Sequence, residues 1–250
     1  MSEDEKLKTA ASNPLGVAVV TGGSGGIGQA VVARLSRDGF TTVSWSRRPA
    51  VPCTTAHMAL DVTDAAAVDR TAARTVTECG AIRALVVNAG IQGPIKPLWE
   101  IGPDEFRHVI ETNLVSAHLT LRAVVPLMLA NDGPDRGRIV LVSSVQGKEG
   151  TALAGAYAAS KAGMIALGKT LGKELADKGI LVNVVTPTVV RSTMETALSP
   201  ERRQDLLARI PMGRFLEPEE VAAMVSWLCG SDCTASTGAV FDLSGGRTTY

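Results

Sequence analysis

Tyr157 and Lys161, in the segment YAASK, are the residues whose types and spacing most directly suggest acid-base chemistry. Four positions apart on a helix, both side chains lie on one face and can reach a common ligand. Tyrosine has a pKa near 10, so acid-base work near pH 7 needs about 4 kcal/mol of help. An ammonium about 5 Å away supplies roughly 3 kcal/mol at an effective dielectric of about 20. We expect Lys161 to lower the pKa of Tyr157, although the same spacing also describes an ordinary solvated helix face.

Three other polar residues stand in apolar surroundings where a substrate could be handled. Ser143 and Ser144 end a β-rich run, and a hydroxyl there can hydrogen-bond a substrate carbonyl while the tyrosine protonates it. For Ser143, packing at the strand end is the alternative. Asn113, in ETNL, interrupts an apolar helical stretch, so we expect it to be buried with hydrogen-bond partners.

A glycine-rich segment, TGGSGGIG, joins the first β-rich run to an amphipathic helix. Glycine permits a tight turn, lets backbone N–H groups approach a diphosphate and places its charge at a helix N-terminus. Two patterns overlap, G-x-G-x-x-G from Gly23 and T-G-x-x-x-G-x-G from Thr21, and they leave the register open. The segment predicts a dinucleotide site, with a flexible loop as the alternative. The positive ring of an oxidised nicotinamide would then complete the lowering of the tyrosine pKa.

The residues after the second β-rich run bear on the type of dinucleotide. NAD-binding sites usually carry an acid there, which accepts hydrogen bonds from the ribose hydroxyls. This chain has Ser46, Arg47 and Arg48 instead, and guanidinium groups bind a 2′-phosphate through forked hydrogen bonds. The segment favours NADP(H) over NAD(H). Two solvated arginines are the alternative.

Two more segments follow β-rich runs at the edge where a nucleotide would lie. Asp61 can accept a hydrogen bond from an adenine amino group, or it can cap the helix after Asp64. Asn88-Ala89-Gly90 combines an amide with two small residues, so the backbone can pass close to a sugar or ring. A plain turn is the alternative for this second segment.

These segments need a scaffold that brings the ends of several strands together. Short apolar runs alternate with helical patterns along the whole chain, which predicts a parallel sheet covered by helices on both faces. We expect a single α/β domain, a Rossmann-type doubly wound sheet of seven strands, whose ligands bind at the carboxyl ends of the strands. The expected strands are Val17–Thr21, Thr41–Ser46, Ala56–Leu60, Ala84–Asn88, Arg138–Ser143, Leu181–Thr186 and Ala239–Asp242, with helices at Gln29–Arg37, Ala65–Glu78, Asp104–Leu129 and Tyr157–Asp177.

Composition restricts the class of partner. Lys and Arg number 25, as do Asp and Glu, so a charge-driven nucleic-acid binder is not expected. No apolar run reaches the roughly 18 residues of a membrane helix, and the N-terminus is polar. Residues 1–14 form an expected tail before one domain, 15–250. The four cysteines (Cys53, Cys79, Cys229 and Cys233) lack zinc spacing with histidine, and we expect them to be reduced in a soluble, cytoplasmic protein.

Together, TGGSGGIG, the NAG at 88–90, ETNL, a serine thirteen residues before YAASK, and Pro187 after LVNVVT resemble the short-chain dehydrogenase/reductase family. The resemblance extends from about Leu15 to Gly246. Within the family, the chain is similar to the subgroup of 3-oxoacyl-carrier-protein reductases and related sugar-acid and alcohol dehydrogenases. It implies four catalytic roles: Asn113 for a relay water, Ser144 for substrate orientation, Tyr157 for acid-base catalysis and Lys161 for ribose binding.

The resemblance also implies a set of cofactor contacts. It fixes the glycine register to Gly22, Gly26 and Gly28, and it places Ser46 where NAD-using relatives usually carry aspartate. Two departures lie beside the nicotinamide: Thr188 replaces the glycine that usually follows the proline, and Ser192 replaces a usual threonine. The remaining cofactor contacts that it implies are Ser24, Gly25, Ile27, Arg47, Arg48, Asp61, Val62, Asn88, Ala89, Gly90, Pro187 and Val190.

The substrate region is expected in a lid over residues 188–215, with helical patches at Thr193–Leu198 and Glu201–Ile210. A pocket wall of mostly apolar residues with a few polar ones suits a ketone of moderate size. For the nearby Lys148 and Arg191, we expect side chains that face solvent. Arg136 and Lys178 remain as candidate contacts for an acyl-carrier protein, which is itself acidic. Because the segment 131–136 is acidic too, recognition of a carrier protein stays unproven. The expected pocket residues are Ser144, Val145, Gln146, Leu153, Tyr157, Val190 and Met194.

The sequence predicts an NADPH-dependent ketone reductase with Tyr157 as proton donor and a 3-oxoacyl compound as one candidate substrate. An alcohol or sugar-acid dehydrogenase that uses NAD(P) and works oxidatively is the alternative. A nucleotide-sensing protein without catalysis is the remote alternative, because Tyr157 and Lys161 are both present. By the same resemblance we expect a homotetramer that pairs the two long helices. The charge balance, the lack of a long apolar run and the cysteine spacing predict no nucleic-acid, membrane or metal partner.

Overall fold

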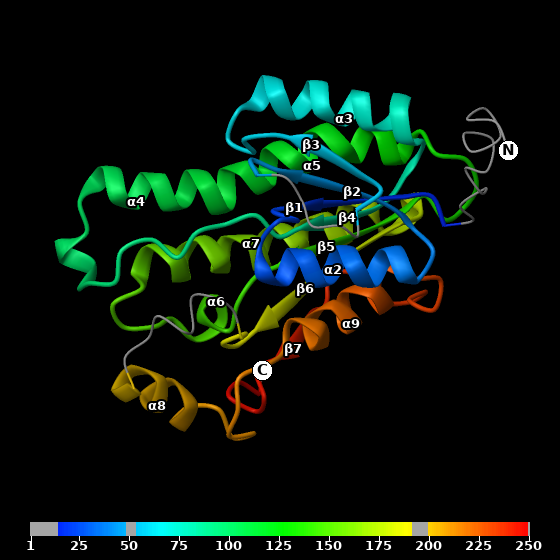
Figure 1. The fold of residues 1–250 in the computed structure, drawn as a ribbon. Coiled ribbons are helices and arrows are strands. Elements are labelled where there is room, and N and C mark those ends of the chain that lie inside the picture. Colours follow the sequence, from blue (N-terminus) through cyan, green and yellow to red (C-terminus); the bar gives the residue numbers. More distant parts are fainter. Residues whose placement is uncertain (1–14, 49–53, 192–199, 250) are drawn as a thin grey trace, which may run out of the picture.

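Seven parallel strands form one sheet in the computed structural model, which describes residues 15–48, 54–191 and 200–249 (Figure 1). Helices cover both faces, so the predicted α/β doubly wound fold is confirmed. Cys53, Ser192, Met194 and the patch Thr193–Leu198 lie outside the described residues. The strands are β1 (Val17–Thr21), β2 (Thr41–Ser46), β3 (Ala56–Ala59), β4 (Ile82–Val87), β5 (Gly137–Val142), β6 (Ile180–Pro187) and β7 (Val240–Leu243).

The order of the strands determines where a ligand can enter. The sheet runs β3-β2-β1-β4-β5-β6-β7, so the chain builds outward from β1 in one direction and then from β4 in the other. Loops that leave the carboxyl ends of β1 and β4 therefore diverge to opposite faces and open a crevice between them. The predicted segments TGGSGGIG, Ser46-Arg47-Arg48, Asn88-Ala89-Gly90 and Ser143-Ser144 lie at the carboxyl ends of strands of this sheet, whereas Asn113, Tyr157 and Lys161 lie in helical segments.

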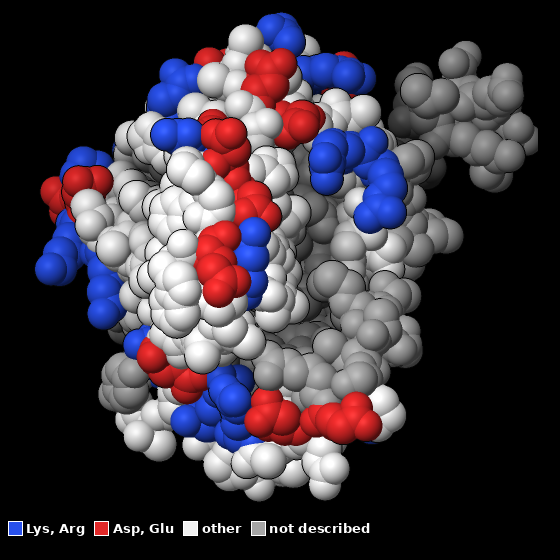
Figure 2. Space-filling view, turned by 90° about the vertical axis from the view of Figure 1, so that its left-hand side faces the viewer, with Lys and Arg blue, Asp and Glu red and all other residues white. Residues whose placement is uncertain are grey.

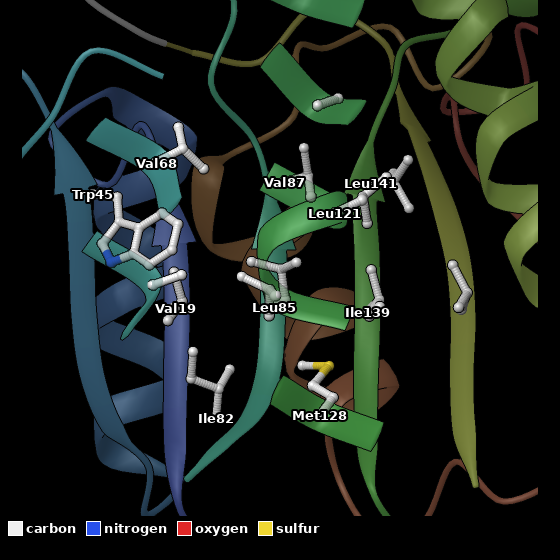
Figure 3. Close-up of a cluster of buried hydrophobic side chains, with 14 of the residues drawn as sticks. Val19, Trp45, Val68, Ile82, Leu85, Val87, Leu121, Met128, Ile139 and Leu141 are labelled. Atoms are coloured by element: carbon white, nitrogen blue, oxygen red, sulfur yellow. The ribbon is translucent and has the colours of Figure 1, made fainter. Parts of the chain in front are cut away.

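Alternate residues along the strands divide between two hydrophobic cores. On β1, Val17 and Val19 belong to one core, and Ala18 and Val20 to the other, as the two-residue repeat of a strand requires. Figure 3 shows the first core, where side chains of β1, β4 and β5 meet those of α3 and α5. Trp45 is fully buried there, and its indole N–H donates to Thr75 Oγ1 at 3.1 Å.

The helices begin where the sequence supplies capping groups. Asp64 accepts from the Ala67 N–H at 2.9 Å and starts α3, so Asp61 is not the cap. Pro218 occupies the first turn of α9, where Glu220 accepts from the Glu217 N–H at 2.8 Å. The helices are α2 (Gly26–Arg37), α3 (Ala65–Cys79), α4 (Pro103–Ile110), α5 (Ser116–Leu129), α6 (Gln146–Glu149), α7 (Gly155–Leu175), α8 (Pro200–Ala208) and α9 (Pro218–Cys229).

The predicted single helix Asp104–Leu129 is interrupted. A π-helical turn, Glu111–Val115, separates α4 from α5 and contains Asn113, which has no exposed surface. Such turns admit one extra residue and often occur at functional sites. No glycine or proline marks the segment, which is why helical periodicity alone predicted an unbroken helix.

Some strand limits also differ from the prediction. β4 begins at Ile82, two residues early, because Ile82 is buried although Arg83 beside it is polar. It ends before Asn88, whose side-chain amide instead bonds the turn after β1. The strand limits are therefore set by tertiary contacts that local composition does not contain.

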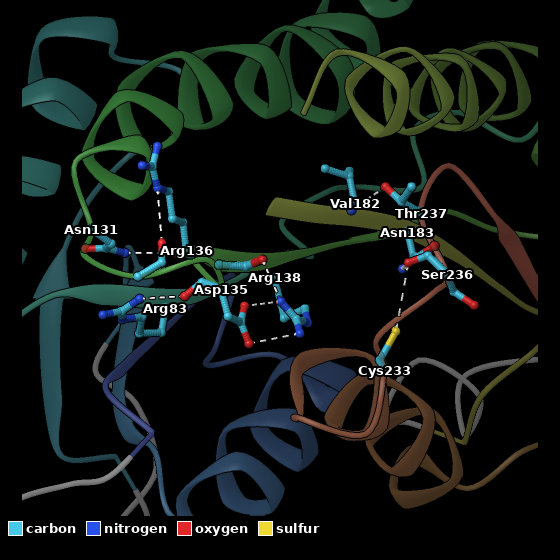
Figure 4. Close-up of polar contacts among 12 residues, drawn as sticks. Arg83, Asn131, Asp135, Arg136, Arg138, Val182, Asn183, Cys233, Ser236 and Thr237 are labelled. Atoms are coloured by element: carbon cyan, nitrogen blue, oxygen red, sulfur yellow. Dashed lines mark hydrogen bonds and ion pairs between the residues drawn. The ribbon is translucent and has the colours of Figure 1, made fainter. Parts of the chain in front are cut away.

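The amino-terminal edge of the sheet is tied by polar side chains (Figure 4). Asn131 Nδ2 donates to Arg136 O at 2.8 Å, and Asp135 forms an ion pair with the buried Arg138. Arg136 and Lys178 precede β5 and β6. They therefore lie at the opposite edge from Ser144 and Tyr157, so the idea that they meet a carrier protein at the pocket entrance is wrong.

The run of helix from Pro103 to Leu129 is long and apolar. By length and composition alone, this run could cross a membrane. The buried apolar residues of α5, among them Leu121, Val124 and Met128, belong to the first hydrophobic core, as those of a core helix do.

Candidate active site

In the glycine turn after β1, backbone atoms pack too closely to leave room for side chains at Gly22 and Gly28. Gly22 has a φ of +67°, which favours glycine. A Cβ on Gly28 would lie 2.2 Å from Gly22 O, so the first turn of α2 presses directly on the loop. Ser24, Gly25, Gly26 and Ile27 carry the chain into α2, whose first turn holds no acidic residue. Because it carries no acidic side chain, the N-terminus of this helix suits a diphosphate.

The loop after β4 is bonded to that turn. Thr21 Oγ1 accepts from the backbone N–H groups of Asn88 and Ala89 at 2.9 and 3.1 Å, and Asn88 Nδ2 donates to Thr21 O at 3.1 Å. A Cβ on Gly22 would lie 3.0 Å from Ala89 Cα. Asn88 thus holds the two loops at the crevice together, and Thr21, the first residue of the T-G-x-x-x-G-x-G pattern, is a positioning residue.

The segment Ser46-Arg47-Arg48 lies at the carboxyl end of β2. Ser46 is buried and its hydroxyl donates to Arg48 O at 2.8 Å, whereas both arginine residues are exposed. The serine thus shapes the bend, and the two guanidinium groups remain on the surface beside it. A 2′-phosphate at this end of β2 would meet positive charge and no carboxylate of its own loop.

Asp61 and Val62 lie beyond the end of β3. Asp61 Oδ1 accepts from the Thr63 N–H at 3.0 Å and from its hydroxyl at 2.8 Å, and these bonds lower the pKa of the carboxyl group. Asp61 remains exposed, and Val62 is nearly buried. The carboxylate is therefore held in a fixed orientation with its ionised form favoured, as a contact to an exocyclic amine would require.

Ser144 and Tyr157 meet beyond β5. Ser144 is 7% exposed, its Oγ accepts from the Gln146 N–H at 3.2 Å, and its side chain hydrogen-bonds the Tyr157 phenol. The structure therefore brings together the two hydroxyl groups that the sequence predicted would share a carbonyl. A substrate oxygen placed at both would receive two hydrogen bonds.

Lys161 is buried beneath this pair. Its Nζ donates to Val142 O at 2.8 Å and lies 5.7 Å from the centroid of the Tyr157 ring. The Ser143 hydroxyl donates to Lys161 O at 2.7 Å, so packing alone, the alternative for Ser143, is not the whole account. A Cβ on Gly147 would lie 2.7 Å from the Lys161 carbonyl carbon. Ser143 and Gly147 thus fix the lysine from two sides.

Burial sets the direction of both pKa shifts. It raises the pKa of Tyr157, with the Ser144 hydrogen bond opposing, and it lowers the pKa of Lys161 to about 8. The expectation that Lys161 lowers the pKa of Tyr157 is therefore not met in the chain without cofactor, where burial outweighs any effect of the ammonium. At pH 7 the phenol is neutral and can donate its proton.

Asn113 connects the π-helical turn to α7. Its Oδ1 accepts from the Ile91 N–H at 2.7 Å, and its Nδ2 donates to Ile91 O and Ser160 Oγ at 2.9 and 3.0 Å. A Cβ on Gly90 would lie 3.0 Å from Asn113 Oδ1 and 3.7 Å from Lys161 Nζ. The predicted need for partners is thus met, and Asn113 lies next to Lys161. Ser160 is a partner that no sequence pattern signalled.

The loop after β6 forms the other wall of the crevice. The Val145 N–H donates to Pro187 O at 3.1 Å, which joins this loop to the one after β5. Val190 forms a bridge with Leu216. Leu153 is 42% exposed and has a φ of +68°, a strained conformation for a leucine that is typical of functional sites.

Lys148 departs from its predicted solvation. Its side chain is only 7% exposed, and its ammonium bonds Asp242 Oδ1 at 3.2 Å and Thr248 Oγ1 at 3.1 Å. Arg247 pairs with Glu149 in the same region. These contacts attach the C-terminal segment to α6, the short helix after Ser144. Arg191 is half exposed and pairs with Glu217 at 3.2 Å.

These residues fit a nicotinamide dinucleotide along the carboxyl edge. The glycine turn offers backbone N–H groups for a diphosphate, in a cradle that a Cβ on Gly28 would fill. In the order of the sheet, Ser144 follows β5 and lies between this turn and the loop after β6. The arrangement can bind a dinucleotide, orient a carbonyl and supply a proton to its oxygen. Within the described residues no cluster of side chains suits a metal.

Comparison with known proteins identifies relatives over nearly the whole chain. A family model described as enoyl-(acyl carrier protein) reductase matches residues 22–248. The chain is 42% identical over 240 residues to the 2-dehydro-3-deoxy-L-rhamnonate dehydrogenase (NAD(+)) of Sphingomonas sp. (strain SKA58), covering 93% of this chain and 95% of that protein. It is 34% identical to the 3-oxoacyl-(acyl-carrier-protein) reductase FabG of Escherichia coli (strain K12), over 92% of this chain and 96% of that one.

Solved structures agree with these relatives. A variant of actinorhodin polyketide ketoreductase with NADPH superimposes with a TM-score of 0.88 at 31% identity, covering 96% of this chain and 100% of that one. The structure of gox2181 gives a TM-score of 0.86 at 27% identity, covering 92% and 95%. The likeness therefore spans the fold and all of the predicted site segments within it.

Lys161→Met should remove a pH dependence of stability. The folded-state pKa of Lys161, about 8, lies below the ordinary 10.5, so between these values the unfolded chain binds more protons. The burial cost of the ammonium, at most about 3 kcal/mol, is fully present below pH 8 and disappears as pH rises to 10.5. We expect the Tm of the variant minus that of the wild type to fall across this range in calorimetry without cofactor.

Lys173→Met is the control, because Lys173 is an exposed lysine of the same helix. Its Tm difference from the wild type should stay constant over the same range. An equally constant difference for Lys161→Met would contradict the burial of a charged lysine.

Proposed function

Because the chain belongs to the short-chain dehydrogenase/reductase family, we propose that it interconverts a ketone and a secondary alcohol with Tyr157 as the proton donor. The relatives are oxidoreductases acting on CH–OH and C=O groups. The observation that carries the proposal is the contact of Ser144 with Tyr157 above the buried Lys161. Ketone reduction is the direction that we favour.

In this proposal each side chain acts on one oxygen atom. A bound nicotinamide supplies the hydride to the carbonyl carbon. The Ser144 and Tyr157 hydroxyls hold the carbonyl oxygen, and the phenol gives up its proton as charge grows there. Because burial raises the pKa of Tyr157, the neutral acid needed for reduction predominates at pH 7. Lys161 offsets the phenolate that remains, and Asn113 keeps the loop after β4 against α7.

Tyr157→Phe should abolish turnover and preserve the cofactor site. The ring is retained while the proton donor is removed, so kcat should fall by about 10²- to 10⁴-fold. The Kd for NADPH, measured by fluorescence titration, should stay within about threefold. Turnover at the wild-type rate would refute the assigned role, and loss of NADPH binding would indicate a structural effect instead.

The proposed cofactor is NADP(H). Supporting this choice, Arg47 and Arg48 are exposed beside the end of β2, and no carboxylate occupies the position of Ser46. One structural neighbour was solved with NADPH. The 42% identical relative is named for NAD(+), so membership of the family does not decide between the cofactors. The proposal rests on the charge of this loop.

Replacing Arg47 and Arg48 with alanine should discriminate between the two cofactors. Charge-assisted hydrogen bonds contribute about 1.5–3 kcal/mol each, so the Kd for NADPH should rise tenfold or more. The Kd for NADH should change less than threefold. Arg37→Ala, an exposed arginine at the end of α2, should alter neither. Equal losses for both cofactors would exclude a phosphate clamp.

A sugar-acid or alcohol dehydrogenase that works oxidatively with NAD(P) is the second candidate function. The rhamnonate dehydrogenase relative favours it. Oxidation requires the phenolate of Tyr157, whose formation burial opposes, so it would depend more strongly on Lys161 and the cofactor charge. The remote alternative, a nucleotide-sensing protein without catalysis, is disfavoured by the intact Ser144, Tyr157 and Lys161. A substrate panel assayed in both directions with both cofactors separates the three.

We propose a small-molecule ketone or alcohol as the partner, and a cytoplasmic location. The described cysteines Cys79, Cys229 and Cys233 are free thiols, which agrees with a reducing compartment. On the face in Figure 2, blue and red side chains are intermixed, which supports the absence of a nucleic-acid partner. Delivery of the substrate by an acyl-carrier protein lacks support from Arg136 and Lys178.

A homotetramer is the proposed assembly. The helix run Pro103–Leu129 is apolar but only 39% buried in its most apolar window. On α7, Ala159, Ala162 and Ala166 are exposed small residues that permit close helix contact. Figure 2 also shows broad uncharged surface at the end of the molecule that carries α4. These features suit pairing of the long helices of two copies.

Light scattering should give a mass about four times the 26.0 kDa of the chain. Ala162→Arg should reduce this mass, because a guanidinium would be buried at the helix contact. Ala73→Arg, at an exposed position on α3, should not. A monomeric wild type would overturn the proposed assembly.

A further inference from the structure

Polar side-chain atoms without partners cluster around the candidate active site. Among the described residues, four such atoms are buried, and three of them belong to Gln146, Thr151 and Thr188. Gln146 follows Ser144 by two positions, Thr151 lies in the turn that leads to Tyr157, and Thr188 follows Pro187. The fourth atom is Nε of Arg138, whose guanidinium is otherwise bonded to Asp135.

Gln146 and Thr188 lie beyond the carboxyl ends of two neighbouring strands, β5 and β6. The Val145 N–H donates to Pro187 O at 3.1 Å, so each of these residues directly follows one member of a bonded backbone pair. The Gln146 N–H also donates to Ser144 Oγ at 3.2 Å. Gln146 is thus two residues from Ser144, and Thr188 directly follows the residue whose carbonyl is bonded to the same loop.

Burial of Gln146 Oε1 and Thr188 Oγ1 without hydrogen-bond partners lowers the stability of the fold. The Thr188 residue is 7% exposed, and its backbone N–H is bonded to Leu243 O at 3.0 Å, yet its hydroxyl has no partner. An apolar isostere at such a position would avoid the desolvation penalty. The Gln146 amide presents a buried polar atom whichever way it is turned. A ligand with hydrogen-bonding groups would satisfy both.

The surrounding charges narrow the chemistry of that ligand. Lys148 and Arg191 are the cations of these loops, and each lies 3.2 Å from a carboxylate, Asp242 and Glu217 respectively. Their charge is therefore largely compensated within the protein. Recognition at Gln146 and Thr188 then depends on neutral hydrogen bonds, which suit hydroxyl groups. A hydrocarbon acyl chain would leave both atoms unsatisfied.

We propose that Gln146 and Thr188 form a polar subsite that binds hydroxyl groups adjacent to the reacting carbon, so that the substrate is a polyhydroxylated ketone or alcohol. The assignment rests on the proposed function, since it takes the reacting oxygen to lie at Ser144 and Tyr157. It gives the two residues a role in specificity that is separate from proton transfer. Hydroxyl binding here discriminates sharply, because a substrate that lacks the hydroxyl leaves buried polar atoms without partners.

Matched ketones test the subsite by kinetics. L-erythrulose and 2-butanone share a four-carbon chain, as dihydroxyacetone and acetone share three carbons, and only the first of each pair carries hydroxyl groups, on both carbons next to the carbonyl. We expect the wild type to prefer the hydroxylated member by at least tenfold in kcat/KM. Gln146→Leu combined with Thr188→Val should reduce that preference at least tenfold, and Thr188→Ser should largely retain it. Preference for the deoxygenated ketones, or an unchanged ratio in the double variant, would overturn the subsite.

Thermal shifts measure the same subsite without catalysis. With NADPH present, the hydroxylated ketones should raise the Tm of the wild type and not that of the double variant. Thr188→Val should itself raise the Tm of the free protein, since it removes an unsatisfied hydroxyl. A Tm shift without turnover would refute the proposed function and leave the subsite standing. Absence of any shift would refute the subsite, and a weakened NADPH Kd in Thr188→Val would assign that hydroxyl to the cofactor instead.

Discussion

The buried ammonium of Lys161 is the constraint on which the rest of the site depends. Its hydrogen bond to Val142 O ties α7 to the last residue of β5, and the Ser143 hydroxyl makes a second tie to the lysine carbonyl. These contacts fix where Tyr157 stands relative to Ser144. Burial also lowers the pKa of Lys161 to about 8 and raises that of Tyr157, so the same packing places the two groups and sets their protonation.

The loops where a nucleotide would bind are likewise held by a few specific contacts. The turn after β1 is held by the close backbone packing of Gly28 against Gly22 and by the hydrogen bonds between Thr21 and Asn88. Asn113 continues the chain of contacts from the loop after β4 to Ser160 on α7, the helix that also carries Lys161. A cofactor in the crevice would therefore touch loops that are already bonded to α7, the helix that carries Tyr157 and Lys161.

The sequence predicted the fold and the location of the site because both follow from patterns that repeat along the chain. Continuous apolar strands and intervening helices determine a parallel sheet, and a parallel sheet gathers TGGSGGIG, Ser144 and Pro187 at one edge. The π-helical turn around Asn113, the burial of Lys148 and the location of Arg136 and Lys178 at the far edge were missed or misjudged. Each depends on a partner distant in sequence, such as Asp242 for Lys148, 94 positions away.

Specificity is the property that the family likeness leaves undecided, for a physical reason. The likeness covers residues 22–248, and most of those residues build the sheet and its helices, which any relative must retain. In the proposed function, the charge of one short loop at Ser46 selects the cofactor, and the side chains of Gln146 and Thr188 select the substrate. A relative named for NAD(+) and a neighbour solved with NADPH can therefore share this fold. The unsatisfied atoms of the crevice are informative because they are a stability cost that the fold itself does not require.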